Sequence, residues 1–368
     1  MSKDFILFES YPNFSGSAFE VYIRMLKQGY AKKYCMLWAV DDADMKTELP
    51  FPSVPFFNAS RYIQNAILAN THLIIDSNRY INRSCADYRI HLRHGCSFKK
   101  CTGYYSTVGT VDAIITTSDA MKAIDERVWP ASCKGKFVVT GLPSNDRLFA
   151  PTDIYANGFM RELTGTDNRY NKIIGWLPTF RQHRYGDKNI NHKYPYGLPL
   201  IKSNNDLEQL NSILHDENML LLVQMHHAQA ANYTKPGAYS NIKFVTQSLK
   251  AKYNITNGDL MGFFDAMITD YSAAYHEYII LNRPIALTID DIDEYAKTVG
   301  FCYSYTDWIK GHYCTTITHL IDFIASIVNG TDQFITDRTA ARDRIHKYVD
   351  ASSSNRVIQL LHEQGIIK

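Results

Sequence analysis

Short apolar runs, each followed by turn-forming residues and a helical pattern, recur along all 368 residues of the chain. A run of three to seven mostly apolar residues suits a strand that is buried on both faces, and repeated strand–helix units pack as a mostly parallel sheet between helices. The alternation therefore predicts an α/β fold. In the first 140 residues the predicted strands are 5–8, 34–40, 54–57, 73–76, 89–92, 113–117 and 137–140, with helices to about residue 29, at 61–69 and after Ser118.

Turn formers between residues 141 and 152 interrupt this alternation, which then restarts. The later predicted strands are 173–177, 220–225, 242–245, 266–268 and 285–288, and the later predicted helices are 206–214, 272–281, 317–328, 337–348 and 355–363. We therefore predict two doubly wound domains that face each other. Because ligands of such sheets bind beyond the carboxyl ends of the strands, the cleft between the domains is the expected site.

Composition narrows the classes of function. A net charge of +2 gives no overall field that would favour nucleic acid. No run of about 18 apolar residues is present, so we expect no membrane-spanning helix. The amino terminus lacks the pattern of a signal peptide, so we expect the seven cysteines to be reduced, cytosolic thiols. Cys96 and Cys101 lie near two histidines, but the absence of a Cys-x-x-Cys pair argues against zinc.

The stretch 260–284 contains the strongest candidate for a ligand site. An apolar run at 266–268 ends at the small polar residues Thr269, Asp270 and Ser272, after which the apolar spacing becomes helical. Ser272 is thus a predicted helix N-cap at a strand-to-helix turn. Unpaired N–H groups and the helix dipole make such a turn a seat for phosphate, although a serine that only caps its helix is the simpler interpretation.

Polar residues follow two other predicted strands. His94, next to Gly95, could be a general base, because a histidine titrates near neutrality; a capping or surface histidine is the alternative. Arg181 follows 173–177 and suits phosphate oxygens or, equally, a salt bridge between domains.

The adjacent His226 and His227 follow a further predicted strand and point opposite ways if extended, so at most one of them faces a ligand. Glu277 lies one turn into its helix, where a carboxylate could bind ribose hydroxyls or be simply solvated. Together these side chains suit an anionic, nucleotide-linked substrate. No acidic pair stands at a strand end to hold a metal, so arginine, histidine and backbone dipoles would meet the phosphate charge.

Five segments resemble, in order, the motifs of the CDP-glycerol glycerophosphotransferases, which include teichoic acid primases and polymerases and related capsule polymerases. These segments are His-Gly-Cys-Ser-Phe-Lys at 94–99, Gly-Leu-Pro-Ser-Asn-Asp at 141–146, Pro-Thr-Phe-Arg at 178–181, Gln-Met-His-His at 224–227, and Thr-Asp-Tyr-Ser-Ala at 269–273 with Glu277. The family patterns are His-Gly-Thr-Pro-x-Lys, Gly-x-Pro-Arg-x-Asp, Pro-Thr-Phe/Trp-Arg, Lys-x-His-Pro and Thr-Asp-Tyr-Ser-Ser with Glu or Asp. The chain departs from them at Cys96, Ser97, Gln224 and His227, and Gln224 removes one positive charge near the donor.

The resemblance implies two Rossmann-like domains of the GT-B type. It implies an acceptor domain at 1–148, a nucleotide-donor domain at 149–345 and a C-terminal helix at 346–368 that packs on the first domain. It also implies transfer of glycerol phosphate, or a related polyol phosphate, from CDP-glycerol or a related CDP-polyol to a hydroxyl group, with release of CMP. The residues expected are His94 and His226 for catalysis; Arg181, Thr179, Thr269, Asp270, Ser272, Ala273 and Glu277 for the donor; and Ser10, Asn13, Gly16, Gly95 and Lys99 for the acceptor. No metal and no cofactor is expected.

The implied acceptor is a lipid-linked or polymeric saccharide at the inner face of the cell membrane, which the protein would contact peripherally. Six basic residues against one acid, Asp87, suit anionic headgroups or form a solvated basic face. They are Arg79, Arg83, Arg89, Arg93, Lys99 and Lys100. Two other functions stay open: a GT-B glycosyltransferase that uses a nucleotide sugar, and a catalytically silent nucleotide-binding subunit of a capsule assembly complex.

Overall fold

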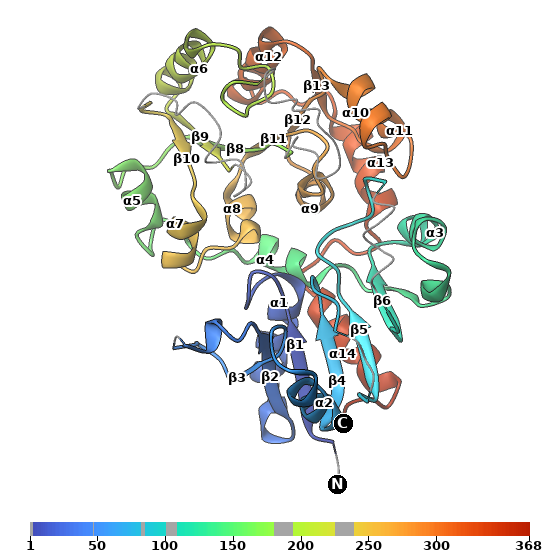
Figure 1. The fold of residues 1–368 in the computed structure, drawn as a ribbon. Coiled ribbons are helices and arrows are strands. Elements are labelled where there is room, and N and C mark those ends of the chain that lie inside the picture. Colours follow the sequence, from blue (N-terminus) through green and yellow to red (C-terminus); the bar gives the residue numbers. More distant parts are fainter. Residues whose placement is uncertain (1–2, 47, 82–84, 101–108, 180–193, 225–238) are drawn as a thin grey trace. The chain divides into compact units, whose positions relative to one another are not determined.

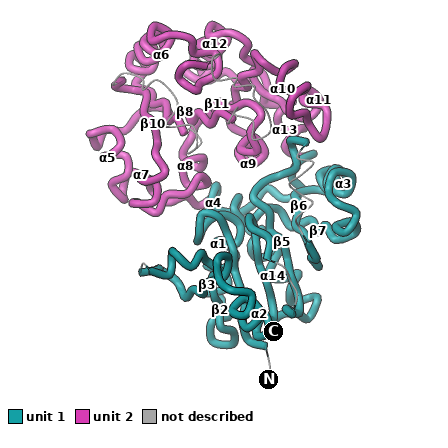
Figure 2. Tube along the Cα trace, in the orientation of Figure 1, with its two compact units in different colours: residues 1–149, 344–368 teal, residues 150–343 magenta. Residues whose placement is uncertain are grey.

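The computed structural model describes residues 3–46, 48–81, 85–100, 109–179, 194–224 and 239–368 (Figure 1). The chain forms two compact units (Figure 2): unit 1 comprises residues 1–149 and 344–368, and unit 2 comprises residues 150–343. This division lies one residue after the predicted boundary at 148 and two residues before the one at 345. The acceptor and donor roles of the two parts stay predictions.

Unit 1 is built on a parallel seven-stranded sheet in the order β3-β2-β1-β4-β5-β6-β7. Its strands are β1 (Phe5–Glu9), β2 (Cys35–Val40), β3 (Ser53–Pro55), β4 (Thr71–Asp76), β5 (Tyr88–His91), β6 (Ala113–Thr116) and β7 (Phe137–Val139). Leu7, Ile74 and Ile90, on three neighbouring strands, are fully buried. Helices cover both faces of a parallel sheet, which is why its central strands are apolar throughout.

The C-terminal helix of the chain belongs to unit 1. The unit's helices are α1 (Gly16–Lys27), α2 (Arg61–Ala69), α3 (Asp119–Val128), α4 (Asp146–Phe149) and α14 (Ser353–Glu363). The carboxylate of Asp146 accepts hydrogen bonds of 2.8 Å from the backbone N–H groups of both Ser353 and Ser354. A carboxylate at the positive end of α14 satisfies two otherwise unpaired donors and fixes the end of the chain.

Unit 2 is built on a parallel six-stranded sheet in the order β10-β9-β8-β11-β12-β13. Its strands are β8 (Lys172–Leu177), β9 (Met219–Val223), β10 (Ile242–Phe244), β11 (Ala266–Thr269), β12 (Ile285–Thr288) and β13 (His312–Cys314). Gly175 on β8 lies so close to the ring of Phe264 that an added Cβ would come within 2.0 Å of it. The missing side chain thus allows Phe264 to fill the core under β8.

Unit 2 has more helices than the sequence predicted. They are α5 (Phe159–Thr164), α6 (Asn204–Asp216), α7 (Gln247–Lys252), α8 (Asn257–Phe263), α9 (Ala274–Tyr278), α10 (Ile292–Thr298), α11 (Tyr305–Trp308), α12 (Ile317–Val328) and α13 (Ile335–Ile345), the last ending in unit 1. Helices α5, α7, α8, α10 and α11 and strand β13 were not predicted. Each is only three to seven residues long, too short to show an apolar period.

Candidate active site

A fully buried ion-pair network lies at the carboxyl ends of β4 and β5 in unit 1. Asp76 accepts from Arg89 Nε at 2.8 Å and contacts His91 Nδ1 at 2.7 Å. Burial alone would raise the pKa of Asp76, but Arg89 and His91 outweigh it and lower the pKa. Burial lowers the pKa of His91. Because these side chains are enclosed and bind one another, they position the sheet edge rather than contact a substrate.

A second network holds the loop that carries His94. Arg93 donates to Asp125 at 2.6 Å and to the hydroxyl of Ser97 at 2.9 Å, and its guanidinium lies over the ring of Trp129. The Trp129 indole N–H also donates to Ser97, at 3.1 Å. Ser97 stands where the resembled family pattern has proline. Its hydroxyl instead links the arginine to the indole, so the loop is fixed by hydrogen bonds.

His94 lies three residues beyond the end of β5, at the surface of unit 1. Its Nδ1 is 3.3 Å from the carbonyl oxygen of Ser77, an arrangement in which Nδ1–H donates and the neutral ring carries its lone pair on Nε2. Desolvation of the ring lowers the pKa of His94 to about 4, and the charges of His91 and Arg93 act in the same direction. The neighbouring Gly95 has φ +144°, a backbone conformation that favours glycine. His94 is therefore neutral at pH 7, as a general base must be.

Three of the six residues predicted to form a basic surface, Arg79, Arg89 and Arg93, are not free to bind a headgroup, so the prediction is wrong for these three. Arg89 and Arg93 are buried in the two networks above. Arg79 pairs with Glu9 at 3.1 Å and with Asp41 at 2.8 Å. A cation held by a buried carboxylate is not available to a lipid headgroup. Arg83 lies outside the described residues.

The loop after β1, predicted to meet the acceptor, is tied down by its own hydrogen bonds. Ser10 is fully buried; its hydroxyl donates to the carbonyl of Pro12 at 2.9 Å and accepts from the N–H of Ser15 at 3.0 Å. Its hydroxyl thus holds the loop, and its contact with the acceptor stays a prediction. Asn13 donates to Asp44 at 2.7 Å and accepts from Arg79.

Gly16 and Lys99, the other acceptor residues predicted in unit 1, stay open as contacts. The position of a Cβ on Gly16 has nothing within 4 Å, so space remains in front of its backbone. Lys99 is half-buried. Both residues stay predictions.

In unit 2, the ends of β8 and β11 are joined by side chains that were predicted to bind the donor. Thr269 donates to the carbonyl of Leu177 at 2.8 Å, and the carboxylate of Asp270 accepts from the N–H of Thr179 at 2.9 and 3.0 Å. Asp270 also accepts from the N–H of Tyr271 at 2.6 Å. Thr269 and Asp270 are fully buried and Thr179 nearly so, and their hydrogen bonds hold the turn between the two strand ends. Their contact with the donor stays a prediction.

The turn after β11 differs from the prediction. The N-cap of α9 is Ala273 and not Ser272, and α9 is five residues long, followed by a 3-10 turn at Ile279–Leu281. The hydroxyl of Ser272 accepts instead from the N–H of Ala274, at 3.3 Å. Tyr271 fixes the turn, because its hydroxyl donates to Asp291 at 2.8 Å and its ring stacks on Tyr295. Because α9 is shorter than the predicted helix 272–281, its dipole at this end is weaker than the prediction assumed.

Glu277 differs from the other carboxylates at this edge. It is half-buried, and burial raises its pKa to about 7. Within the part of the chain that the structure describes, no hydrogen bond or ion pair reaches its carboxylate. A desolvated carboxylate without a partner is costly unless a ligand completes its hydrogen bonds. Glu277 is therefore the clearest candidate for ligand contact in unit 2.

Two predicted residues, Arg181 and His226, lie outside the described residues, as does His227. Gln224, the first residue after β9, is described: its N–H donates to the carbonyl of Trp176 at 2.9 Å and its side chain donates to Asn257 at 2.8 Å. Among the residues with described positions, no group of three or more histidine, cysteine or acidic side chains could hold a metal ion. No helix in those parts is long and apolar enough to cross a membrane.

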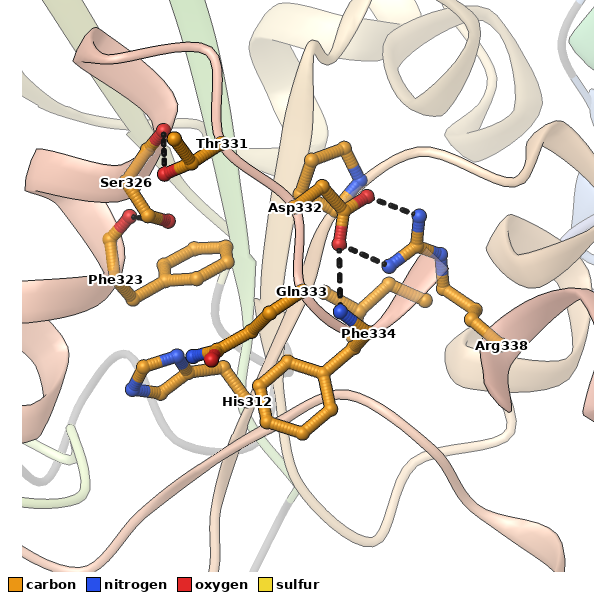
Figure 3. A pocket seen from close by; sticks show the side chains of 10 residues that line it. His312, Phe323, Ser326, Thr331, Asp332, Gln333, Phe334 and Arg338 are labelled. Carbon is orange, nitrogen blue, oxygen red and sulfur yellow. Dashed lines mark hydrogen bonds and ion pairs between the residues drawn. The ribbon is translucent and has the colours of Figure 1, made fainter. Parts of the chain in front are cut away.

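A cavity of about 190 Å³ lies at the opposite edge of the unit 2 sheet. It is lined by Ile285 and His312, the first residues of β12 and β13, whereas the candidate site follows the last residues of β8, β9 and β11. Figure 3 shows the His312 ring close to Phe334, and Asp332 paired with Arg338 beside it. Because Asp332 and Arg338 neutralise each other and the cavity lies at the other ends of the strands, it is not part of the candidate site.

The model of the CDP-glycerol:poly(glycerophosphate) glycerophosphotransferase family matches residues 1–363. A teichoic acid glycerol-phosphate primase of Bacillus subtilis is 29% identical over 211 residues, 57% of this chain and 49% of the relative. A teichoic acid poly(ribitol-phosphate) polymerase of Bacillus spizizenii is 28% identical over 190 residues, 51% of this chain and 28% of the relative. The chain thus spans about half or less of the length of these two relatives.

The solved structure of the wall teichoic acid polymerase TagF superposes with a TM-score of 0.74 at 21% identity, covering 99% of this chain and 89% of the other. At this level of identity the likeness shows the fold, which confirms the predicted pair of parallel α/β sheets of the GT-B type. The fold alone does not select a reaction.

Proposed function

Because the chain belongs to the CDP-glycerol:poly(glycerophosphate) glycerophosphotransferase family, we propose that it transfers a polyol phosphate from a CDP-polyol to an acceptor hydroxyl and releases CMP. The observation that carries this proposal is the match of the family model over residues 1–363. CDP-glycerol is the first donor to test, and CDP-ribitol is the second, since the relatives include glycerol-phosphate and ribitol-phosphate enzymes. The acceptor would be a lipid-linked or polymeric saccharide in the synthesis of a teichoic acid-like or capsule polymer.

In this reaction the acceptor oxygen attacks the β-phosphorus of the donor, the bond from that phosphorus to the bridging oxygen breaks, and CMP leaves with the bridging oxygen. The acceptor proton passes to His94 Nε2, which has the lone pair when Nδ1–H faces the Ser77 carbonyl. A positioned base of this kind contributes roughly 10²–10⁴ in rate. Gly95 supports the role by allowing the backbone next to His94 to adopt its positive φ.

The donor would be held by unit 2. Glu277 would accept hydrogen bonds from the ribose hydroxyls, which supplies the partners that its carboxylate lacks among the described side chains. The backbone at Ser272 and Ala273, together with Arg181 and His226 from outside the described residues, would bind the pyrophosphate. No metal is part of this proposal, since arginine, histidine and N–H groups would stabilise the developing charge.

We place the protein in the cytoplasm, in peripheral contact with the inner face of the cell membrane, because a lipid-linked acceptor would lie there. Helix α2 supports such a contact. Its Tyr62 is 84% exposed and its Ile63 is 41% exposed, and amphipathic and apolar side chains of this kind insert at headgroup level.

The test is to incubate the purified protein with one donor and a panel of lipid-linked acceptors, and to measure the nucleotide released. CMP from CDP-glycerol or CDP-ribitol, only when an acceptor is present, supports the proposal, and the activity should survive EDTA. Release of UDP or GDP from a nucleotide sugar would instead identify a glycosyltransferase. Binding of the CDP donor without turnover on any acceptor would identify a silent nucleotide-binding subunit.

A further inference from the structure

A buried lysine lies at the carboxyl end of β9 in unit 2. Lys250, on α7, is 4% exposed. Its Nζ donates to Asn257 Oδ1 at 2.5 Å, and the same oxygen accepts from Gln224 Nε2 at 2.8 Å. Gln224 directly follows β9 and Asn257 begins α8. Two donors from separate elements thus converge on one neutral amide oxygen, close to the strand ends that carry the candidate site.

No negative charge neutralises this lysine within the described parts of unit 2. The only hydrogen-bond partner of its ammonium group there is Asn257, and burial alone lowers its pKa to about 8. The segment that follows Gln224, residues 225–238, contains no aspartate or glutamate. The side-chain oxygen of Gln224 is also buried and has no hydrogen-bond partner among the residues that the structure describes. A buried ammonium group is costly unless an anion pairs with it, and one amide oxygen supplies no charge.

Lys250 lies beside position 224, where this chain lacks the positive charge of the resembled family pattern. The resembled family pattern has lysine where this chain has Gln224, and the Gln224 side chain and the Lys250 ammonium group bind the same oxygen. The positive charge is therefore present beside position 224, although it comes from another helix.

We propose that Lys250 binds a phosphate group of the bound CDP-polyol at the carboxyl end of β9. The phosphate would be the counter-ion that the described residues do not provide. This inference rests on the proposed function, because the donor supplies the phosphate. A charge-assisted hydrogen bond in a desolvated place contributes about 10- to 100-fold in affinity.

The experiment compares Lys250→Met with wild type by calorimetric titration with CDP and, separately, with cytidine. We expect CDP to bind about 10- to 100-fold more weakly to the variant and cytidine to bind equally, because only CDP carries phosphate. The melting temperature should not fall, since an unpaired buried charge is removed. Lys250→Met/Gln224→Lys should regain CDP affinity, because it returns an ammonium group to the same place.

Lys252→Met is the matched control. Lys252 lies on the same helix but is exposed and paired with Glu162, so its loss should leave CDP affinity unchanged. If Lys250→Met does not fold, Lys250→Gln keeps a donor to Asn257 and removes only the charge. Equal CDP affinity in wild type and a folded Lys250 variant would overturn this inference alone. A wild-type protein that binds neither CDP nor a CDP-polyol would overturn it together with the proposed function.

Discussion

The carboxyl edges of the two sheets both carry buried charges, yet the described charges are arranged differently. In unit 1, Asp76 binds Arg89 and His91, and Asp125 binds Arg93, so that each charge faces an opposite one. In unit 2, Glu277 and Lys250 have no oppositely charged partner among the described residues. Breaking a buried pair is costly, while a buried charge without a partner lowers stability until a ligand binds. The buried charges of unit 1 therefore hold its own loops and strands together, whereas those of unit 2 are the ones proposed above to meet a ligand.

Glu9 and Glu277 sharpen this contrast, because burial raises the pKa of each to about 7. Glu9 is fully buried and accepts from the backbone N–H groups of Ser77, Asn78 and Arg79, at 3.3, 3.0 and 2.9 Å. Glu277 is only half-buried and accepts nothing from the described residues. Similar pKa values thus arise in Glu9, whose hydrogen bonds are made within the protein, and in Glu277, whose carboxylate can still accept hydrogen bonds from a ligand. Hydrogen-bond partners, rather than the pKa, distinguish the two roles.

The largest effect is expected from Asp76→Asn in unit 1. The substitution leaves the buried Arg89 without its counter-charge, which should lower the free energy of unfolding by about 3–5 kcal/mol. Denaturant unfolding monitored by circular dichroism measures the loss. Arg161, exposed and paired with Asp167, provides the control, since Asp167→Asn should change stability by less than about 1 kcal/mol. Similar losses in both variants would contradict the distinction between buried and exposed pairs.

His94→Ala should lower turnover at least ~100-fold, the low end for a general base. Donor affinity and melting temperature should stay near the wild-type values, because the base acts mainly in the transition state and the hydrogen bond of the His94 ring to Ser77 is long, at 3.3 Å. Turnover, donor affinity and melting temperature are measured on one preparation. Turnover within a few-fold of wild type per folded molecule would remove His94 as the base. The enclosed Asp76 and His91 are then poor substitutes.

Glu277→Gln should make the protein more stable and a weaker donor binder. A carboxylate whose folded pKa is raised binds its proton more tightly in the folded state. The stability that Glu277 contributes by binding this proton is therefore fully present below 4.5, its pKa in the unfolded chain. It is lost as the pH rises through about 7, its pKa in the folded protein. At pH 8 the substitution should add about 1–2 kcal/mol, allowing for partial exposure, and weaken donor binding about 10-fold. A loss of stability with unchanged donor affinity would assign Glu277 a structural role.

The pH dependence of kcat/KM should distinguish the titration of Glu277 in unit 2 from that of His94 in unit 1. We expect it to rise with pH through about 7 as Glu277 deprotonates, and a second limb should lie near pH 4, where His94 loses its proton. In Glu277→Gln the limb near 7 should disappear and the limb near 4 should stay. A limb near 7 that persists in this variant would point to Glu9 instead.

The smallest effect concerns the surface of unit 1. Tyr62→Ser/Ile63→Ser should weaken binding to vesicles that contain anionic lipid by a few-fold, because both side chains are exposed on α2. Co-sedimentation with the vesicles measures this. Val328→Ser, at an exposed apolar position in unit 2, is the control and should leave vesicle binding unchanged. Equal weakening by the control would show that the contact is not specific to α2.

Local pattern was sufficient for much of the fold and for part of the site. The apolar run at 266–268 predicted β11, and His94 was found because a polar residue follows a strand. The short helices of unit 2 were missed, although Thr256 and Asp259 form a capping box that marks the start of α8 and could have been recognised. Lys250 was missed because a lysine in Leu-Lys-Ala-Lys has the pattern of a solvated helix.

By itself, the sequence determined the α/β class, the strand–helix alternation, the family resemblance and the residue types at the strand ends, because these depend on neighbours within a few positions. Tertiary structure alone decided which charges are neutralised. Asp76 meets Arg89 only when β4 pairs with β5, and Lys250 meets Gln224 and Asn257 only when three elements of unit 2 pack together. Burial and partnership are properties of contacts distant in the chain. For that reason Thr269 and Asp270, which resemble ligand contacts in the sequence, are enclosed, while Lys250 gained a candidate role.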